Sequence, residues 1–411
     1  MSFSITKYNI HEWFMAAGVF CMSVYSKGVT VFLALAFLTM LLQVLVGGRK
    51  LEWRSLNALA FLFFAIFSTF LLSGIWNDWN HKTALSEIET KISFLAFPLL
   101  FLFSPKSILS AQRKLQWALV AGCVSFAIAC HIHALVGFYE TGLWEEFVYG
   151  RLSWTFHPSY LGFFYLLSMV ILASEFLDST NKIYSKWLLT GIVFFSLETA
   201  FMASRAGFLA LFLFYGIFIF YVFRSGKSKT KAYTVVGSSL ISFLILFFGF
   251  SPISGRAKEA VANSASITET KKEEKVASTS ERIVSWQTAW ELGRNYPLGV
   301  GTGNWKSHFT ERYKQKGANF AAEHAHPAHN AYLQMLVEWG WLGLLTLLSL
   351  LFVGLRRAWQ LNDLFFLVFV LGTSFHFIFE SMLELQQGLV FIGFWMFFLV
   401  HRSQNAVVLK S

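Results

Sequence analysis

The sequence predicts an all-α polytopic membrane protein with about 12 transmembrane helices. Its 411 residues are 55% hydrophobic and only 14% charged, whereas a soluble domain carries about 25% charged residues. Phe contributes 47 residues and Trp 15, an abundance that suits lipid-facing surfaces and interfacial aromatic belts. Apolar runs long enough to cross about 30 Å of hydrocarbon recur from one end of the chain to the other.

These apolar runs define the expected membrane helices in order. The predicted spans are 10–26, 28–47, 56–74, 88–104, 115–137, 159–176, 187–203, 206–223, 233–250, 332–354, 362–380 and 387–401. No small-residue cleavage site follows the first run, so it is predicted to be a membrane helix rather than a removed signal peptide. The cysteines, Cys21, Cys123 and Cys130, are scattered within apolar runs and indicate neither a disulfide framework nor a metal site.

The distribution of cationic residues predicts the orientation. Alternate connections between the spans are rich in Lys and Arg, and Lys7, Arg402 and Lys410 lie near the termini. The cation-rich connections hold Arg49, Lys50, Arg54, Lys106, Arg113, Lys114, Lys182, Lys186, Arg224, Lys227, Lys229, Lys231, Arg356 and Arg357. By the positive-inside rule, these connections and both termini are cytoplasmic. An even number of spans requires the same arrangement of the termini.

The predicted organisation therefore has three parts. Residues 1–250 hold transmembrane helices 1–9, residues 251–331 form a large periplasmic loop, and residues 332–411 hold helices 10–12. Within the loop, the charged run at 271–275 is expected to belong to a solvated helix or a mobile segment without chemistry. After Arg282, the spacing of Ile283, Trp286, Trp290 and Leu292 indicates an amphipathic helix suited to the membrane surface.

Two arginines at the predicted outer face are candidates for function, because a charge at a membrane edge is costly unless it is used or paired. Arg205 lies in Ser204-Arg205-Ala206-Gly207, between two spans with almost no loop. It is suited to hold a lipid phosphate through bidentate hydrogen bonds; the alternative is an Arg that anchors a tight helical hairpin. Arg282 is the second candidate, and the glycines at 299, 301 and 303 beyond it are expected to form turns.

Three histidines lead into the tenth span. His324, His326 and His329 precede Asn330. A zinc site is disfavoured because no Cys or carboxylate other than the neighbouring Glu323 completes a ligand set. A His at the entrance to a membrane helix is better suited to act as general base for a sugar hydroxyl, and His329 is the candidate. Asn330 is expected to orient His329 or to bind a sugar.

A fourth candidate stretch precedes the sixth span. Arg151 is the only cation of a loop that also holds Glu140, Glu145 and Glu146, and His157 follows it. Arg151 either pairs with one of these acids or joins a lipid-phosphate site.

Together these motifs resemble the O-antigen ligase family, which also contains O-antigen polymerases and protein O-oligosaccharyltransferases. The string His329-Asn330, nine residues and then Gly340-Trp341-Leu342-Gly343 is similar to the signature at the start of a late membrane helix in that family. The resemblance extends to Ser204-Arg205-Ala206-Gly207, to residues 282–305 and to His157-Pro158, so it covers residues 140–345. The chain departs from the family pattern at Ser159, where many members have Asn.

The resemblance implies a GT-C-like glycosyltransferase of the bacterial inner membrane, without a cofactor or a nucleic-acid partner. A glycan attached to undecaprenyl diphosphate would be transferred to a hydroxyl of lipid A–core, with inversion at the anomeric carbon. The essential arginines of the family fall on Arg205 and Arg282, which would bind the diphosphate, and its essential histidine falls on His329. The residues expected to bind substrate are Arg151, His157, Arg294, His326 and Asn330.

The residue types fit this chemistry without metal. No DxD-like acidic pair occurs in the predicted outer loops, so arginines are expected to offset the charge that grows on the leaving diphosphate. A polymerase would use the same donor, and the sequence does not separate it from a ligase. A protein O-glycosylation enzyme and a lipid or polysaccharide transporter are further alternatives. Transporters place ionisable residues near the midplane of several spans, whereas here the polar residues gather toward one face, which disfavours transport.

Overall fold

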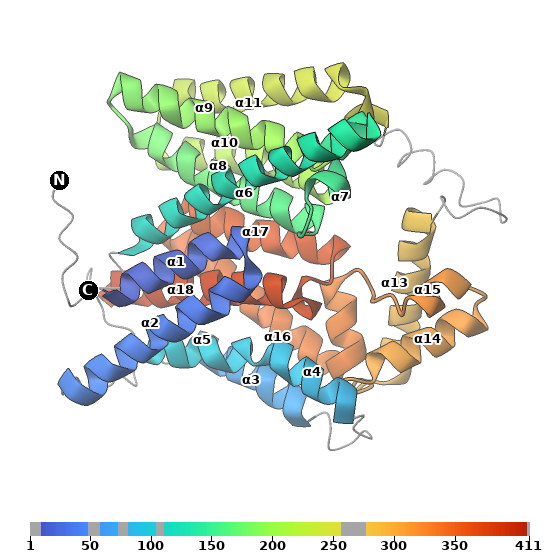
Figure 1. The fold of residues 1–411 in the computed structure, drawn as a ribbon. Coiled ribbons are helices and arrows are strands. Elements are labelled where there is room, and N and C mark those ends of the chain that lie inside the picture. The colour runs from blue at the N-terminus through green and yellow to red at the C-terminus, as the bar shows by residue number, and fades with distance from the viewer. Residues whose placement is uncertain (1–9, 48–57, 73–80, 104–110, 256–276, 409–411) are drawn as a thin grey trace. The chain divides into compact units, whose positions relative to one another are not determined.

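A computed structural model describes residues 10–47, 58–72, 81–103, 111–255 and 277–408 (Figure 1). Within these residues all regular secondary structure is helical. Six helices are long and apolar enough to cross a membrane, and two shorter apolar helices, Ile10–Val24 and Leu364–Phe379, accompany them. The prediction of an all-α polytopic membrane protein is therefore confirmed. The charged run at 271–275 lies outside the described residues.

The described residues form two compact units, each built from several stretches of chain. Unit 1 draws on Met1–Trp53, Leu102–Ala257 and Ala358–Gly372, and unit 2 on Arg54–Phe101, Lys258–Arg357 and Thr373–Ser411. The helices of unit 1 are α1 (Ile10–Val24), α2 (Ser26–Gly47), α6 (Gln112–Thr141), η3 (Trp144–Phe147), α7 (Tyr149–Leu152), α8 (Pro158–Asp178), α9 (Lys182–Phe201), α10 (Arg205–Ser225) and α11 (Lys229–Gly249).

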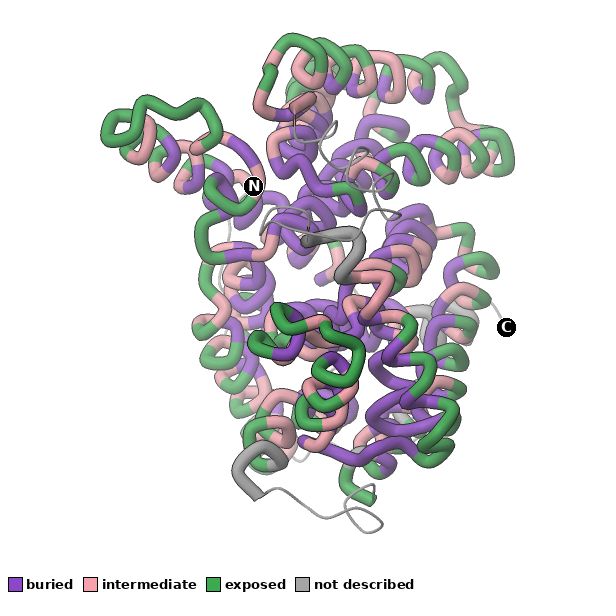
Figure 2. Tube along the Cα trace, turned by 90° about the vertical axis from the view of Figure 1, so that its right-hand side faces the viewer, coloured by how far each residue is buried: buried purple, intermediate pink, exposed green. Residues whose placement is uncertain are grey.

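The core of unit 1 lies around α8. The hairpin of α1 and α2 (blue in Figure 1) packs on α6, α6 packs on α8, and α9 contacts both α8 and α11. In α8, 89% of the most apolar window is buried, against 22% in α2 and in α11. Apolar side chains on these two helices are exposed, among them Leu45, Val46, Ile245 and Phe248. Figure 2 colours the chain by burial and shows exposed and buried positions interspersed along its helices. Such surfaces are suited to lipid, so α8 is the central helix and α2 and α11 are lipid-facing.

Hydroxyl groups join the helices of unit 1 where little water reaches them. Ser196 Oγ of α9 donates to Ser239 O of α11 at 2.9 Å, and Ser239 Oγ donates to Tyr215 Oη of α10 at 3.0 Å. Small polar residues of this kind are common at interfaces between membrane helices.

Unit 2 holds the remaining helices, with α16 and α17 shared between the two units. They are α3 (Ala58–Leu72), α4 (His81–Lys91), α5 (Ser93–Leu102), α13 (Ala277–Asn295), α14 (Trp305–Gln315), α15 (Asn319–Glu323), α16 (Ala331–Leu361), α17 (Leu364–Phe379), η5 (Met382–Glu384) and α18 (Gln386–Val408).

Helices α13 to α15 pack together and share their buried apolar residues with the first turns of α16. Trp305, Phe309 and Tyr313 of α14 are buried together with Leu292 of α13. Leu292 was expected on a membrane-facing surface, and this detail is wrong because the residue packs into the protein core. Trp290, on the same helix, is 47% exposed.

Helix α16 is interrupted at Gly340, which has φ 64° and ψ −160°. The loop of residues 297–301 crosses the helix here: Val300 N–H donates to Val337 O at 2.8 Å, and Trp341 N–H donates to Pro297 O at 3.0 Å. These bonds satisfy backbone groups that the interruption removes from the helical ladder. A Cβ on Gly340 would lie 2.7 Å from Gly299 N, so glycine is required here for a backbone crossing.

Candidate functional site

His329 occupies a strained position at the start of α16. Its φ is 48°, a left-handed conformation that costs a residue with a Cβ about 1–2 kcal/mol. Asn330 follows as the cap of the helix, since its Oδ1 accepts from Leu333 N at 3.0 Å. The surrounding structure must stabilise His329 in this conformation, and such strain is concentrated at functional sites.

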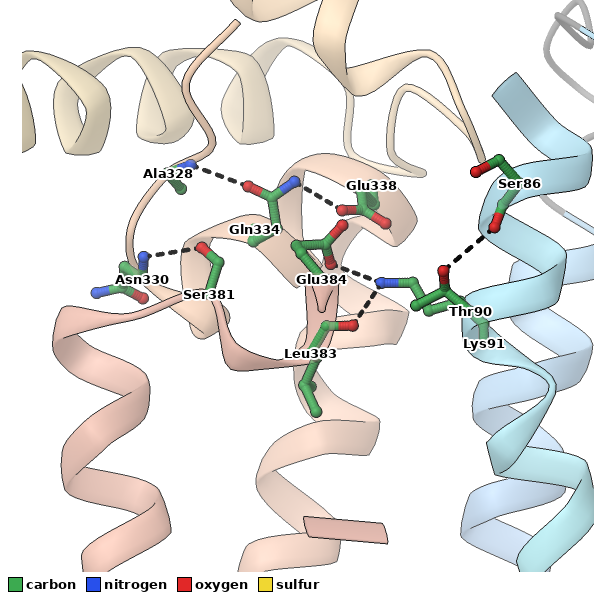
Figure 3. Close-up of polar contacts among 10 residues, drawn as sticks. All are labelled: Ser86, Thr90, Lys91, Ala328, Asn330, Gln334, Glu338, Ser381, Leu383 and Glu384. Carbon is green, nitrogen blue, oxygen red and sulfur yellow. Dashed lines mark hydrogen bonds and ion pairs between the residues drawn. The ribbon is translucent and has the colours of Figure 1, made fainter. Parts of the chain in front are cut away.

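Buried hydrogen bonds hold the peptide groups on both sides of His329 (Figure 3). Ala328 N–H donates to Gln334 Oε1 at 3.0 Å, and Asn330 N–H donates to Ser381 Oγ at 3.2 Å. Gln334 in turn donates from Nε2 to Glu338 Oε1 at 2.6 Å. Gln334 and Glu338 are each 1% exposed. The backbone around His329 is thus tied to α16 on one side and to the segment before α18 on the other.

Lys91, the last residue of α4, completes this polar cluster. Its Nζ donates to Leu383 O at 2.9 Å and to Glu384 Oε1 at 2.6 Å, and its side chain is fully buried. It also interacts electrostatically with Glu338. Figure 3 shows Lys91, Glu338 and Glu384 facing one another, with Ser381 on the same turn as Glu384. In the sequence, Lys91 is a lone cation near the start of the predicted span 88–104.

The three histidines before α16 pack against one another. The ring centroids of His324 and His326 are 5.6 Å apart, as are those of His326 and His329. Burial, and secondarily the neighbouring His324, lowers the pKa of His326 below its ordinary value. Among the described residues no group of three or more His, Cys, Asp or Glu side chains is arranged to hold a metal ion.

Arg282 of α13 is held by the segment that follows α17. Its Nη1 donates to Phe379 O at 2.8 Å, and its Nη2 donates to Glu380 Oε1 at 3.0 Å. The Arg282 side chain is 29% exposed and that of Glu380 is 6% exposed. These contacts engage two of the five N–H donors of the guanidinium. Arg294, near the end of α13, is exposed.

Unit 1 holds the other predicted residues at two adjacent helix N-termini. Arg205 is the first residue of α10, and Ser204 is its cap; His157 caps α8, its Nδ1 accepting from Ser159 N at 3.3 Å. The hydroxyls of Ser159 and Ser204 lie 2.9 Å apart and are buried, so the two N-termini meet. Arg205 itself is exposed. A cation beside the positive ends of two helix dipoles makes a favourable place for an anion.

Arg151 pairs with an acid, which is the first of the two alternatives that the sequence left open. Its Nη1 donates to Glu146 Oε1 at 2.6 Å, and the side chains are 53% and 13% exposed. This pairing connects α7 to η3 within unit 1.

Several polar residues in this geometry were not identified from the sequence. They are Lys91, Gln334, Glu338, Glu380, Ser381 and Glu384 around His329 and Arg282, and the pair His131 and Glu198 in unit 1, whose Nε2 and Oε1 atoms are 2.8 Å apart. A charged residue inside or beside an apolar run was the available signal. Its partners could not be read from the sequence, because Lys91 and Glu384 are 293 positions apart.

Comparison with known proteins bears on the same region. The sequence profile described as O-antigen ligase matches residues 190–348. That stretch includes Arg205, Arg282, His329, Gln334 and Glu338, and it ends before η5. No curated protein matches the chain.

Proposed function

We propose that this chain, in which residues 190–348 match the O-antigen ligase domain, is a ligase. Its donor is a glycan on undecaprenyl diphosphate, and its acceptor is a hydroxyl of lipid A–core. The family implies transfer of a lipid-linked glycan in general; the ligase reaction and the roles of individual residues are the proposal.

The proposed reaction is a single displacement. His329 takes the proton of the acceptor hydroxyl while the acceptor oxygen bonds to the anomeric carbon. The bond from that carbon to the phosphate oxygen breaks, and undecaprenyl diphosphate leaves with the electron pair. Arg205 and Arg282 bind the diphosphate and offset its growing negative charge. Attack opposite the leaving group inverts the anomeric configuration, and no metal takes part.

The observation that carries the proposal is the conformation of His329. A non-glycine residue at φ 48°, with both neighbouring peptide groups held by buried side chains, is maintained against strain inside the matched domain. A general base is served by such an arrangement, because proton transfer depends on the position of the accepting nitrogen.

The remaining residues proposed to bind substrate are chosen by their positions in the sequence. Arg151, His157, Arg294, His326 and Asn330 are proposed to bind glycan or lipid head groups. Of these, Asn330 uses its side-chain oxygen Oδ1 as a helix cap, and its side-chain NH₂ group is proposed to bind a sugar hydroxyl.

The proposed site lies on the periplasmic face of the bacterial inner membrane. Cation-rich connections place both termini in the cytoplasm and residues 251–331 outside. In a variant without native cysteines, Ser307→Cys should react with a membrane-impermeant maleimide in intact spheroplasts, and Ser225→Cys should react only after lysis. The reverse pattern would contradict this orientation.

The function is tested with purified protein, undecaprenyl-diphosphate glycan, lipid A–core and EDTA, comparing wild type with His329→Ala and Arg205→Ala. We expect glycan on lipid A–core with wild type and a loss of about 10²–10⁴-fold in the His329 variant, the range for a general base. His324→Ala, an exposed neighbour, is the matched control and should retain activity.

Other outcomes separate the alternatives. Longer lipid-linked chains in place of glycosylated lipid A–core would identify a polymerase. Full activity of His329→Ala would remove the proposed base. No turnover with or without added metal would favour a transporter.

A further inference from the structure

The peptide groups on either side of His329 are held from two different directions. Gln334, one turn into α16, accepts from Ala328 N–H, and Ser381, at the end of the α17 region, accepts from Asn330 N–H. Ala328 is fully buried, and Asn330 is 8% exposed. The two contacts bracket His329, whose backbone is left-handed. They therefore determine the orientation of the His329 peptide and, through it, of the imidazole.

Glu338 holds the orientation of the Gln334 amide. The Ala328 N–H can only donate, so it faces Oε1 of Gln334, and the NH₂ end of the amide points to Glu338, whose Oε1 accepts from Nε2 at 2.6 Å. Because both side chains are 1% exposed, water does not replace either bond.

Ser381 is fixed by cations on both sides of it in sequence. Arg282 holds Phe379 O and Glu380, and Lys91 holds Leu383 O and Glu384. The short stretch between these contacts carries η5. The Ser381 hydroxyl thus has a defined position although it lies outside a long helix.

We propose that Gln334 and Ser381 are positioning residues for His329, and that Glu338 sets the orientation of Gln334. The proposal rests on the proposed function, in which His329 accepts the proton of the acceptor hydroxyl. Neither side chain is exposed to a donor molecule, so their contribution is to kcat through the placement of the imidazole. A displacement of about 1 Å in a reacting group can lower the rate about 100-fold.

The decisive experiment exchanges the two polar side chains. Gln334→Glu alone places a second carboxyl group against Glu338 and removes the amide donor between them. The double variant Gln334→Glu/Glu338→Gln restores both bonds in exchanged order, because the carboxylate introduced at position 334 accepts from Ala328 N–H and from the amide introduced at position 338. The charge of the cluster around Lys91 is also kept. We expect kcat to fall about 10- to 100-fold in Gln334→Glu and in Gln334→Leu, with the KM for donor within about threefold. The double variant should recover most of the loss.

A matched control and a second variant guard against general effects. Gln315→Leu makes the same change on the exposed end of α14, where Gln315 contacts only Arg312 and Glu311 of its own helix, and should leave kcat unchanged. Ser381→Ala tests the other side of His329 and should lower kcat in the same way. If Gln334→Leu does not purify as folded protein, the inference is tested with Ser381→Ala and with the comparison of Gln334→Glu and Gln334→Glu/Glu338→Gln.

A readout independent of turnover separates this inference from the proposed function. The rate at which diethyl pyrocarbonate modifies His329, followed by peptide mass spectrometry and normalised to the exposed His324, should change in Gln334→Leu and Ser381→Ala and return toward wild type in the double variant. If wild type transfers no glycan, the proposed function fails while this measurement still decides the positioning role. Unchanged His329 reactivity and kcat in folded Gln334→Leu, or a double variant as impaired as Gln334→Glu, would overturn the inference.

Discussion

Arg205 in unit 1 and His329 in unit 2 both lie at the N-terminal end of a long helix, but their surroundings differ. Arg205 is exposed, and its helix end is held by the neutral hydroxyls of Ser204 and Ser159. His329 lies among buried charged and amide groups, with Gln334, Glu338 and Lys91 within one connected cluster. The difference fits the two roles that the proposed function gives these residues. In that proposal the residue that receives a hydrated anionic lipid is accessible, and the proton acceptor is held in place.

The contrast extends to the energetic consequences of mutation. The ion pair of Arg113 with Glu175 in unit 1 lies at the surface, with side chains 66% and 25% exposed, and the loss of such a pair costs little. In unit 2 the same kinds of group are buried, so removing one partner leaves the other without compensation. We therefore expect substitutions near His329 to alter stability and activity together, and substitution of Arg205 to alter activity alone.

The largest expected effect is at the interruption of α16. Gly340→Val introduces a side chain where the conformation is accessible to glycine and where the backbone of residues 297–299 is in contact. Backbone strain and overpacking each cost up to about 3 kcal/mol, so a loss of about 5–6 kcal/mol is expected. Thermal unfolding in detergent measures it. Gly237→Val in α11, where a Cβ meets nothing within 4 Å, should change stability by no more than about 1 kcal/mol. Equal losses of stability in both variants would contradict the special requirement for glycine at position 340.

The second effect is at Lys91. Lys91→Met leaves Glu384 and Glu338 without their buried cation, and a loss of about 3–5 kcal/mol is expected. Adding Glu384→Gln should recover part of that loss, because one of the uncompensated charges is removed. Arg113→Gln provides the comparison from unit 1: its pair with Glu175 is 66% and 25% exposed, and the loss there should be below about 1 kcal/mol. Similar losses of stability in Lys91→Met and Arg113→Gln would show that water reaches the ion pair of Lys91 with Glu384.

These expectations depend on features that the sequence predicted unevenly. The apolar runs located most helices well, as the predicted span 28–47 and α2 show. Caps such as Ser204 and Asn330 make only local contacts, but neither residue was predicted to be a cap. The interruption of α16 is not readable from the sequence, because a single glycine inside the apolar run 332–354 is compatible with a continuous helix. It becomes necessary only when residues 297–301 cross the helix.

The sequence singled out the less buried members of the candidate site and missed the buried ones. Arg205, Arg282 and His329 were recognisable by residue type, motif and position. Lys91 and Glu338 were not, because their significance lies in partners distant in sequence, and a lone charge beside an apolar run does not reveal whether it faces water or protein. Arg151 was predicted in part. Pairing with an acid was one of the two alternatives for it, and the structure shows that the acid is Glu146.

The third prediction compares the two arginines directly. Arg282→Ala leaves Glu380, whose side chain is 6% exposed, without its charged partner, and a loss of about 1.5–3 kcal/mol in stability is expected together with lost activity. Arg205→Ala should lower kcat about 10²–10³-fold, as for removal of one donor to a developing charge, with stability changed by about 0.5 kcal/mol or less. The double variant Arg282→Ala/Glu380→Gln should regain stability and remain inactive. If it regains activity, Arg282 serves only to neutralise Glu380.

The smallest effect concerns the pH dependence of stability near His329. Burial lowers the pKa of His326 in the folded protein from its ordinary 6.5, so below that pH the unfolded chain binds more protons than the folded one. Stability should therefore fall as the pH drops from about 6.5 through the folded pKa, and no further below it. His326→Gln should reduce the decrease in melting temperature between about pH 7.5 and about pH 5.5, and leave unchanged the difference between about pH 7.5 and about pH 8.5, where imidazole is neutral in both states. An undiminished acid-side decrease in the variant would mean that water reaches His326 freely. The surroundings of His329 would then resemble those of Arg205 more closely than the buried cluster indicates.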